Sequence, residues 1–140
     1  MDVSIATAGE PWPSRVLIAE DDADLRRLLA STLRSDGYQV EEVATGFELL
    51  ARASGQGVNV IVSDVRMPGL TGLEVLAGLR ARGRPEIWNT PIILITAFGD
   101  SETHREAERL GAILFDKPFD LDDLRTCVMH LLSARKETTW

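Results

Sequence analysis

The sequence lacks the features that mark secreted, membrane-spanning or nucleic-acid-binding proteins. Its single cysteine, Cys127, excludes a disulfide within the chain and suits a reducing compartment. The longest apolar run, PIILITAF at residues 91–98, is much shorter than a membrane span and is typical of a buried strand. The 15 basic residues are outnumbered by 22 acidic ones, and the net charge of -7 disfavours non-specific contacts with nucleic acid. We therefore expect a cytoplasmic protein that binds neither membranes nor nucleic acid directly.

A chain of 140 residues with 44% apolar and 26% charged residues is typical of one globular domain. Residues 1–13 have neither the basic head nor the apolar centre of a secretion signal, and we expect them to form a flexible leader. Residues 135–140 are polar and are expected to form a C-terminal tail. The predicted domain therefore covers residues 14–134.

Short apolar runs alternate five times with amphipathic stretches, which predicts an α/β fold: a doubly wound parallel sheet with helices on both faces. Helical spacing directs Leu28, Phe47 and Ala51 towards the core. Thr71 and Ser101 stand where they would cap the starts of their helices. The expected strands cover residues 15–20, 38–43, 58–64, 91–96 and 112–117, the second of them at a sheet edge. The expected helices cover residues 22–36, 45–54, 72–81, 101–110 and 120–133.

Polar residues stand where the four buried strands of this prediction end. In an open parallel sheet, ligands bind outside the carboxyl ends of the strands. The polar groups should therefore meet in one crevice. They are Glu20, Asp21 and Asp22 after the first strand, then Asp64, Thr96 and Lys117.

The chemistry of these groups fits the transfer of a phosphoryl group to a carboxylate. Carboxylates in one pocket repel one another, and Mg2+ is a cation that accepts oxygen ligands from carboxylates and water. An ammonium and a hydroxyl group can bind phosphoryl oxygens, while a remaining carboxylate attacks phosphorus. Taken singly, each motif also has a common structural explanation: the acidic triplet as a helix cap, the threonine as a turn former, and Lys-Pro as a surface corner. In combination they predict a phosphoryl-acceptor site.

Four segments, in this order along the chain, resemble the receiver domains of bacterial two-component response regulators, the CheY-like family. VLIAEDDADLRRLL resembles the family's first strand and acidic pair, and VSDVRMPGLTGLEVL resembles its phosphorylation strand and loop. IILITA resembles its hydroxyl strand, and DKPFDLDDL resembles its lysine-proline corner. The resemblance covers residues 14–134 and implies a flavodoxin-like sheet of five strands in the order 2-1-3-4-5.

The resemblance also implies a magnesium site, at which Mn2+ could replace Mg2+. It assigns Asp64 as the phosphoacceptor and as a metal ligand. Asp21 would bind the ion directly, and Glu20 would act through a water molecule. The backbone carbonyl of Arg66 would complete the ligands that the protein supplies.

The groups that follow the phosphoryl group are implied in the same way. Thr96, Ala97 and Lys117 would bind it or respond to it, and a cis bond from Lys117 to Pro118 would aim the lysine.

In the family, an aromatic residue that moves on activation often lies three residues before the lysine. GAILFDK is one residue shorter than the usual stretch, so this position is Leu114, with Phe115 beside it. Either residue is a candidate switch rotor, and Phe115 is alternatively part of the core.

We expect a signalling switch rather than an enzyme with conventional turnover. Asp64 would take its phosphoryl group from a sensor histidine kinase or a histidine phosphotransfer protein. Phosphorylation would change the face formed by residues 101–110, 112–116 and 120–133, which would bind an unidentified output partner or a second copy of the chain. The chain would accordingly be a monomer or a phosphorylation-dependent homodimer. It is either a stand-alone regulator or the receiver of a longer protein.

Two other functions compete with this interpretation. A phosphohydrolase with an aspartyl-phosphate intermediate needs an acid two residues after its nucleophile, and this chain has Arg66 there. A phosphate-independent interaction module would keep the fold without using the site.

Phe98, two residues after Thr96, places a large apolar group where it would shield an acyl phosphate from water. We therefore expect slow loss of phosphate, and we expect Phe98→Asn to lose it several-fold faster in an assay of phosphate release. An unchanged rate in this variant would contradict the shielding.

Overall fold

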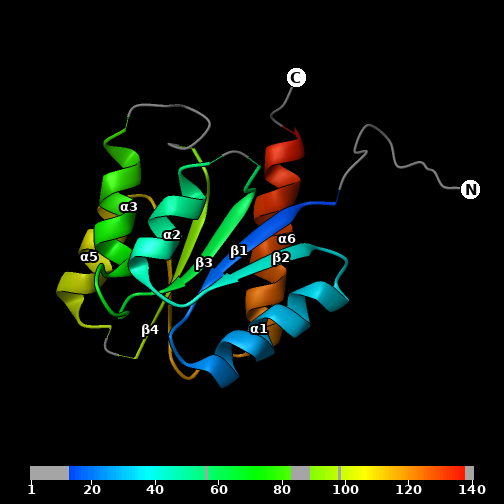
Figure 1. The fold of residues 1–140 in the computed structure, drawn as a ribbon, viewed down its shortest axis with the longest axis horizontal. Helices are drawn as coiled ribbons and strands as arrows, with labels where there is room; N and C mark the ends of the chain where they lie inside the picture. The colour runs from blue at the N-terminus through cyan, green and yellow to red at the C-terminus, as the bar shows by residue number, and fades with distance from the viewer. Residues whose placement is uncertain (1–12, 56, 83–88, 98, 138–140) are drawn as a thin grey trace, which may run out of the picture.

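A five-stranded parallel sheet forms the centre of the molecule, as predicted. The computed structural model describes residues 13–55, 57–82, 89–97 and 99–137, so Phe98 lies outside the described residues. The strands lie in the order β2-β1-β3-β4-β5, with β2 and β5 at the edges (Figure 1). Their bounds are β1 (Arg15–Ala19), β2 (Gln39–Val43), β3 (Val60–Asp64), β4 (Ile92–Thr96) and β5 (Ile113–Asp116).

Helices cover both faces of the sheet. In Figure 1, α1 and α6 lie on one face, and α2, α3 and α5 lie on the other. The last helix continues past the predicted end at residue 133, because residues 134–137 (ARKE) are all good helix formers. The helices described are α1 (Ala23–Ser35), α2 (Gly46–Ala53), α3 (Gly72–Arg80), α5 (Ser101–Arg109) and α6 (Leu121–Glu137).

Alternate strand residues enter two separate hydrophobic layers. In β1, Val16 and Ile18 pack with residues of α1 and α6, whereas Leu17 and Ala19 face the layer formed with α2, α3 and α5. A strand buried on both faces has no polar side, which explains why the inner strands β1, β3 and β4 appear in the sequence as largely apolar runs. Polar residues are left to the strand ends, where Asp64 closes β3 and Thr96 closes β4.

Side-chain caps fix the starts of the helices. The predicted cap at Thr71 is confirmed: its hydroxyl accepts a hydrogen bond from the Glu74 N–H at 3.1 Å, and the Glu74 carboxylate accepts one from the Thr71 N–H at 2.9 Å. The predicted cap at Ser101 is wrong. Asp100 accepts the bond from the Thr103 N–H instead, at 2.8 Å, and Ser101 is the first helical residue. A carboxylate in this position also benefits from the positive end of the helix dipole.

Three residues that helical spacing directed towards the core lie on the surface instead. Leu28 is 49% exposed, Phe47 is 61% exposed, and Ala51 is also exposed. The helices themselves are where the sequence places them, but their buried stripes are rotated from the predicted ones. The buried positions are Leu29, Ala30 and Leu33 in α1, and Gly46, Leu49 and Ala53 in α2.

The close approach of Gly46 to the loop after β3 determines which residues of α2 are buried. The Gly46 N–H donates to the Pro68 carbonyl at 3.4 Å, and a Cβ on Gly46 would overlap the Leu70 carbonyl. We expect Gly46→Ala to lower the free energy of unfolding by about 2 kcal/mol through overpacking. The control is Gly78 in α3, where a Cβ would meet no described atom within 4 Å. Gly78→Ala should raise the free energy of unfolding by about 1 kcal/mol, because alanine has a better helix propensity than glycine. Urea unfolding that moves both variants in the same direction would contradict this packing.

Candidate functional site

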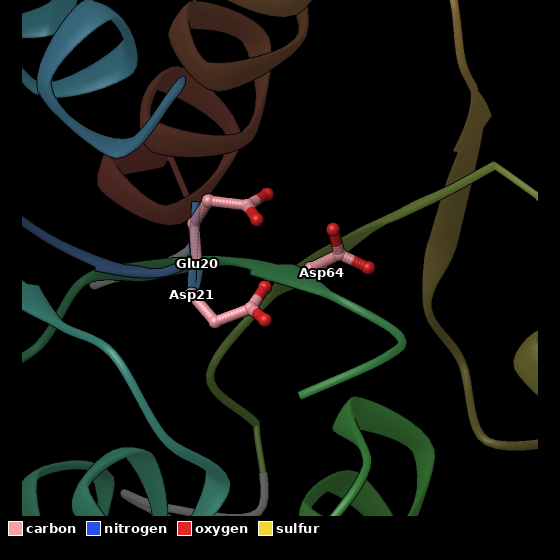
Figure 2. A group of neighbouring side chains, drawn as sticks. All are labelled: Glu20, Asp21 and Asp64. Carbon is pink, nitrogen blue, oxygen red and sulfur yellow. The ribbon is translucent and has the colours of Figure 1, made fainter. Parts of the chain in front are cut away.

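Three carboxylates meet at the carboxyl ends of two neighbouring strands. Glu20 and Asp21 directly follow β1, and Asp64 is the last residue of β3, which pairs with β1. Figure 2 shows the three side chains directed into the same region beyond the strand ends. One carboxylate oxygen of each residue lies within 4.8 Å of the other two. The structure therefore brings together three of the four predicted acids, whereas the Asp22 side chain caps α1 by accepting hydrogen bonds from the Asp24 and Leu25 N–H groups.

Asp64 is held at both of its carboxylate oxygens. Oδ1 accepts a hydrogen bond from the Arg66 N–H at 2.9 Å, and Oδ2 accepts one from Lys117 Nζ at 2.7 Å. The residue is only 6% exposed. These contacts fix the orientation of the carboxylate before any partner binds.

Lys117 reaches Asp64 from the far side of the site. It follows β5, and its backbone N–H donates to the Thr96 carbonyl at 2.7 Å. Burial would by itself lower the pKa of Lys117, but the hydrogen bond and charge of Asp64, together with the Glu20 charge, raise it above its ordinary value. Lys117 is therefore a fixed positive charge among the acids. The bond from Lys117 to Pro118 is cis.

Glu20 is an acid of this cluster whose pKa is raised. It is 1% exposed, and burial raises its pKa to about 7 from an ordinary value of 4.5. The Asp22 N–H donates to Oε2 at 3.1 Å and opposes this shift, whereas the nearby Asp64 carboxylate adds to it. Oε1 has no hydrogen-bond partner among the described residues. A buried carboxylate oxygen of this kind, beside two further acids, fits a cation ligand.

Three other predicted residues follow β3 or lie at the end of β4, the strand next to it. Thr96 is buried at the end of β4, next to β3, and Ala97 follows it on the surface. Arg66 has an exposed side chain, and its N–H points to Asp64. The roles of Thr96, Ala97 and the Arg66 carbonyl stay predictions.

The two candidate rotor residues lie on opposite faces of β5. Leu114 packs with the layer formed by α2, α3 and α5. Phe115 packs with the layer of α1 and α6, where its ring meets the ring of Phe119 edge to face, with centroids 5.8 Å apart. Phe115 is therefore partly buried in the core, and Leu114 is the residue on the side of α5.

Comparison with known proteins identifies the family. A family model described as the response regulator receiver domain matches residues 16–129. The chain belongs to this family. Receiver domains act as signalling switches, and response regulators work with histidine kinases and output domains. Within the described part of this receiver, no helix has the length and hydrophobicity needed to cross a bilayer.

The share of a relative's length that this receiver covers differs from one relative to another. It is 30% identical over 122 residues to sporulation initiation phosphotransferase F of Bacillus subtilis, covering 86% of this chain and 95% of that protein. It is 38% identical over 112 residues to the transcriptional regulatory protein TcrA of Mycobacterium tuberculosis, covering 79% of this chain but 42% of that protein. The structure of the chemotaxis response regulator CheY4 of Vibrio cholerae matches with a TM-score of 0.77 and 33% identity, covering 86% of this chain and 100% of that one. The receiver thus spans less than half of TcrA.

Two contacts near the site were not predicted. Arg26 donates to the backbone carbonyl of Glu20, and His104 Nε2 lies 3.2 Å from Asp116 Oδ2 at the end of β5. A signal for Arg26 was present in the sequence, because it shares a helical face with Ala30 and Leu33, which are both buried. An arginine on an apolar stripe indicates a buried partner. His104 is exposed, and no local sequence pattern indicated its contact with Asp116.

We expect Glu20→Gln to stabilise the metal-free protein above neutral pH. The pKa of Glu20 is about 7 in the folded protein and 4.5 as its ordinary value, so the wild-type protein loses stability as the pH rises between these values. Glutamine carries no charge, so the variant should lose less stability than the wild type as the pH rises. Urea unfolding at about pH 5 and about pH 8 with a chelator measures the difference. Exposed Glu108 provides the control, Glu108→Gln, which should follow the wild type. A wild-type protein more stable than Glu20→Gln at the higher pH would contradict this account of the site.

Proposed function

We propose that this receiver accepts a phosphoryl group on Asp64 from a phosphohistidine. An Asp64 carboxylate oxygen attacks phosphorus in line with the imidazole nitrogen. The O–P bond forms as the N–P bond breaks, and the electron pair of the broken bond stays on the nitrogen. The observation that carries this proposal is the fixed Asp64 carboxylate, hydrogen-bonded to the Arg66 N–H and to Lys117 in a group of three acids.

We propose Mg2+ as the cofactor. Mn2+ accepts similar ligands and could serve in its place. Asp21 and Asp64 would bind the ion directly, Glu20 through water, and Arg66 through its carbonyl. Bound there, the ion would screen the negative charge of the carboxylates and of the incoming phosphoryl group. Oε1 of Glu20 supports this assignment: among the described residues it makes no hydrogen bond, and its nearest charged group is Lys117 Nζ at 3.7 Å.

Lys117 and Thr96 are the groups that we propose for sensing the phosphoryl group. Lys117 pairs with Asp64 before transfer, and its ammonium would then neutralise a phosphoryl oxygen. Thr96 lies at the end of the neighbouring strand, where its hydroxyl would donate to another oxygen, with Ala97 following its movement. Leu114, on the α5 side of β5, would take the place of the family's switch aromatic, while Phe115 would stay in the core.

Movement of Thr96 and Lys117 would change the face formed by α5, β5 and α6. A few kcal/mol of differential binding suffices to shift such an equilibrium between two states. We propose that this face binds an output partner, or a second copy of the chain in a phosphorylation-dependent homodimer. The phosphodonor would be a sensor histidine kinase or a histidine phosphotransfer protein in the cytoplasm. The chain would act as a switch without conventional turnover.

The experiment that tests this proposal uses Mg2+ and acetyl phosphate, a small phosphodonor that needs no partner protein. Intact-mass spectrometry should show the mass of one phosphoryl group on the wild-type chain and none on Asp64→Asn. Asp116→Asn is the matched control, since Asp116 also ends a strand but lies outside the acidic cluster, and it should still react.

Other outcomes support other functions. Rapid release of phosphate without a stable adduct would support a phosphohydrolase. No reaction of the wild-type chain would support an interaction module that does not use the site. An Asp64→Asn chain that gains the same mass would show that the phosphoacceptor is a different residue.

A further inference from the structure

Arg26 lies behind the acidic cluster and holds the corner at which β1 turns into α1. Its Nη1 donates to the Glu20 carbonyl oxygen at 2.8 Å, and its Nε lies 3.6 Å from Glu42 Oε1. The side chains are largely covered, with 19% of Arg26 and 24% of Glu42 exposed. The arginine therefore links the backbone at the end of β1 to a carboxylate on β2.

The Glu20 carbonyl accepts this hydrogen bond at the point where the sheet ends. β1 pairs with β2 as far as Ala19 and Val43, and the Glu20 N–H still donates to the Val43 carbonyl at 3.1 Å. Beyond that point the chain leaves the sheet, and the guanidinium supplies the donor that a strand would otherwise offer. Because a guanidinium presents several N–H donors in one rigid plane, Arg26 can hold the carbonyl while it contacts Glu42.

This corner carries two of the proposed metal ligands. The Glu20 carbonyl belongs to the planar peptide group that joins Glu20 to Asp21, so fixing its oxygen also fixes the start of Asp21. On the other side of Asp21, the Asp22 N–H donates to Glu20 Oε2, and Asp22 Oδ1 accepts from the Asp24 N–H at 2.9 Å. Asp21 is thus held from both sides through its backbone.

We propose that Arg26 is a positioning residue for the metal site, and this inference rests on the proposed function. By holding the Glu20 carbonyl, Arg26 sets the peptide plane between Glu20 and Asp21 and aims the Asp21 carboxylate at the cation. Glu42 fixes the guanidinium in turn, and Arg34 Nη1 steadies Glu42 from the solvent side at 3.0 Å. Partners that orient a metal ligand in this way commonly change metal affinity by about 10–100-fold when they are removed.

The direction of the change in cation affinity distinguishes a positioning role of Arg26 from an effect of its positive charge alone. Removing a positive charge near three carboxylates would strengthen the binding of a cation, whereas loss of the positioning contact would weaken it. Arg27 is a matched control, because it carries the same charge on the next residue, has a side chain that is 66% exposed, and pairs with Asp24 at 2.9 Å.

The test is a calorimetric titration of Mg2+ into the wild-type chain and its variants. Arg26→Gln should weaken Mg2+ binding about ten-fold, and Arg26→Lys should fall between it and the wild type. Arg27→Gln should stay within about two-fold of the wild type. If Arg26→Gln does not fold, Glu42→Gln keeps the arginine and should weaken binding in the same direction by a smaller factor. Unchanged binding, tighter binding, or equal changes in the Arg26 and Arg27 variants would overturn the proposal.

A second measurement needs no metal. Amide hydrogen exchange in the metal-free protein should be faster at Glu20 and Asp22 in Arg26→Gln than in Arg27→Gln, when both are compared with Val62 in the centre of the sheet. Equal exchange in the two variants would overturn the role of Arg26. A wild-type chain that binds no Mg2+ would instead overturn the proposed metal site, and the exchange rates would still show whether Arg26 holds the corner.

Discussion

Electrostatic repulsion among Glu20, Asp21 and Asp64 is the constraint on which the carboxyl end of this sheet depends. One oxygen of each lies within 4.8 Å of the others, and Glu20 and Asp64 are buried. Lys117 supplies one positive charge against three negative ones when all three acids are ionised, which leaves a formal charge of two negatives. Burial raises the pKa of Glu20, and the neighbouring Asp64 carboxylate adds to the shift. A divalent cation has the charge that balances the two negatives.

The fold creates this repulsion by its topology. In a parallel sheet every strand ends at the same edge, so residues far apart in sequence become neighbours, and Lys117 contacts Asp64 across 53 positions of the chain. The two hydrophobic layers make the strands rigid on both faces and leave the strand ends as the place for polar chemistry. In the proposed switch, the same rigidity would let a small change at Thr96 and Lys117 reach α5, β5 and α6 instead of being absorbed locally.

Periodicity and the positions of strand ends predict the order of elements and the meeting of Glu20, Asp21 and Asp64 with Lys117. The sheet order is implied by the resemblance to receiver domains. Prediction from the sequence fails where the outcome depends on one residue's neighbours in space. Phe47 is exposed because the start of α2 lies against the loop after β3, and helical spacing alone carries no information about that loop. The contact of Arg26 with Glu20 likewise depends on how α1 leaves the sheet.

In the proposed site, the three acids and Lys117 surround one divalent cation. The most direct test is a crystal structure of the chain grown with Mn2+, with anomalous scattering recorded to locate the ion. We expect one strong anomalous peak between the carboxylates of Asp21 and Asp64, within coordination distance of both. A peak elsewhere, or none at that position while Lys117 remains paired with Asp64, would contradict the proposed site.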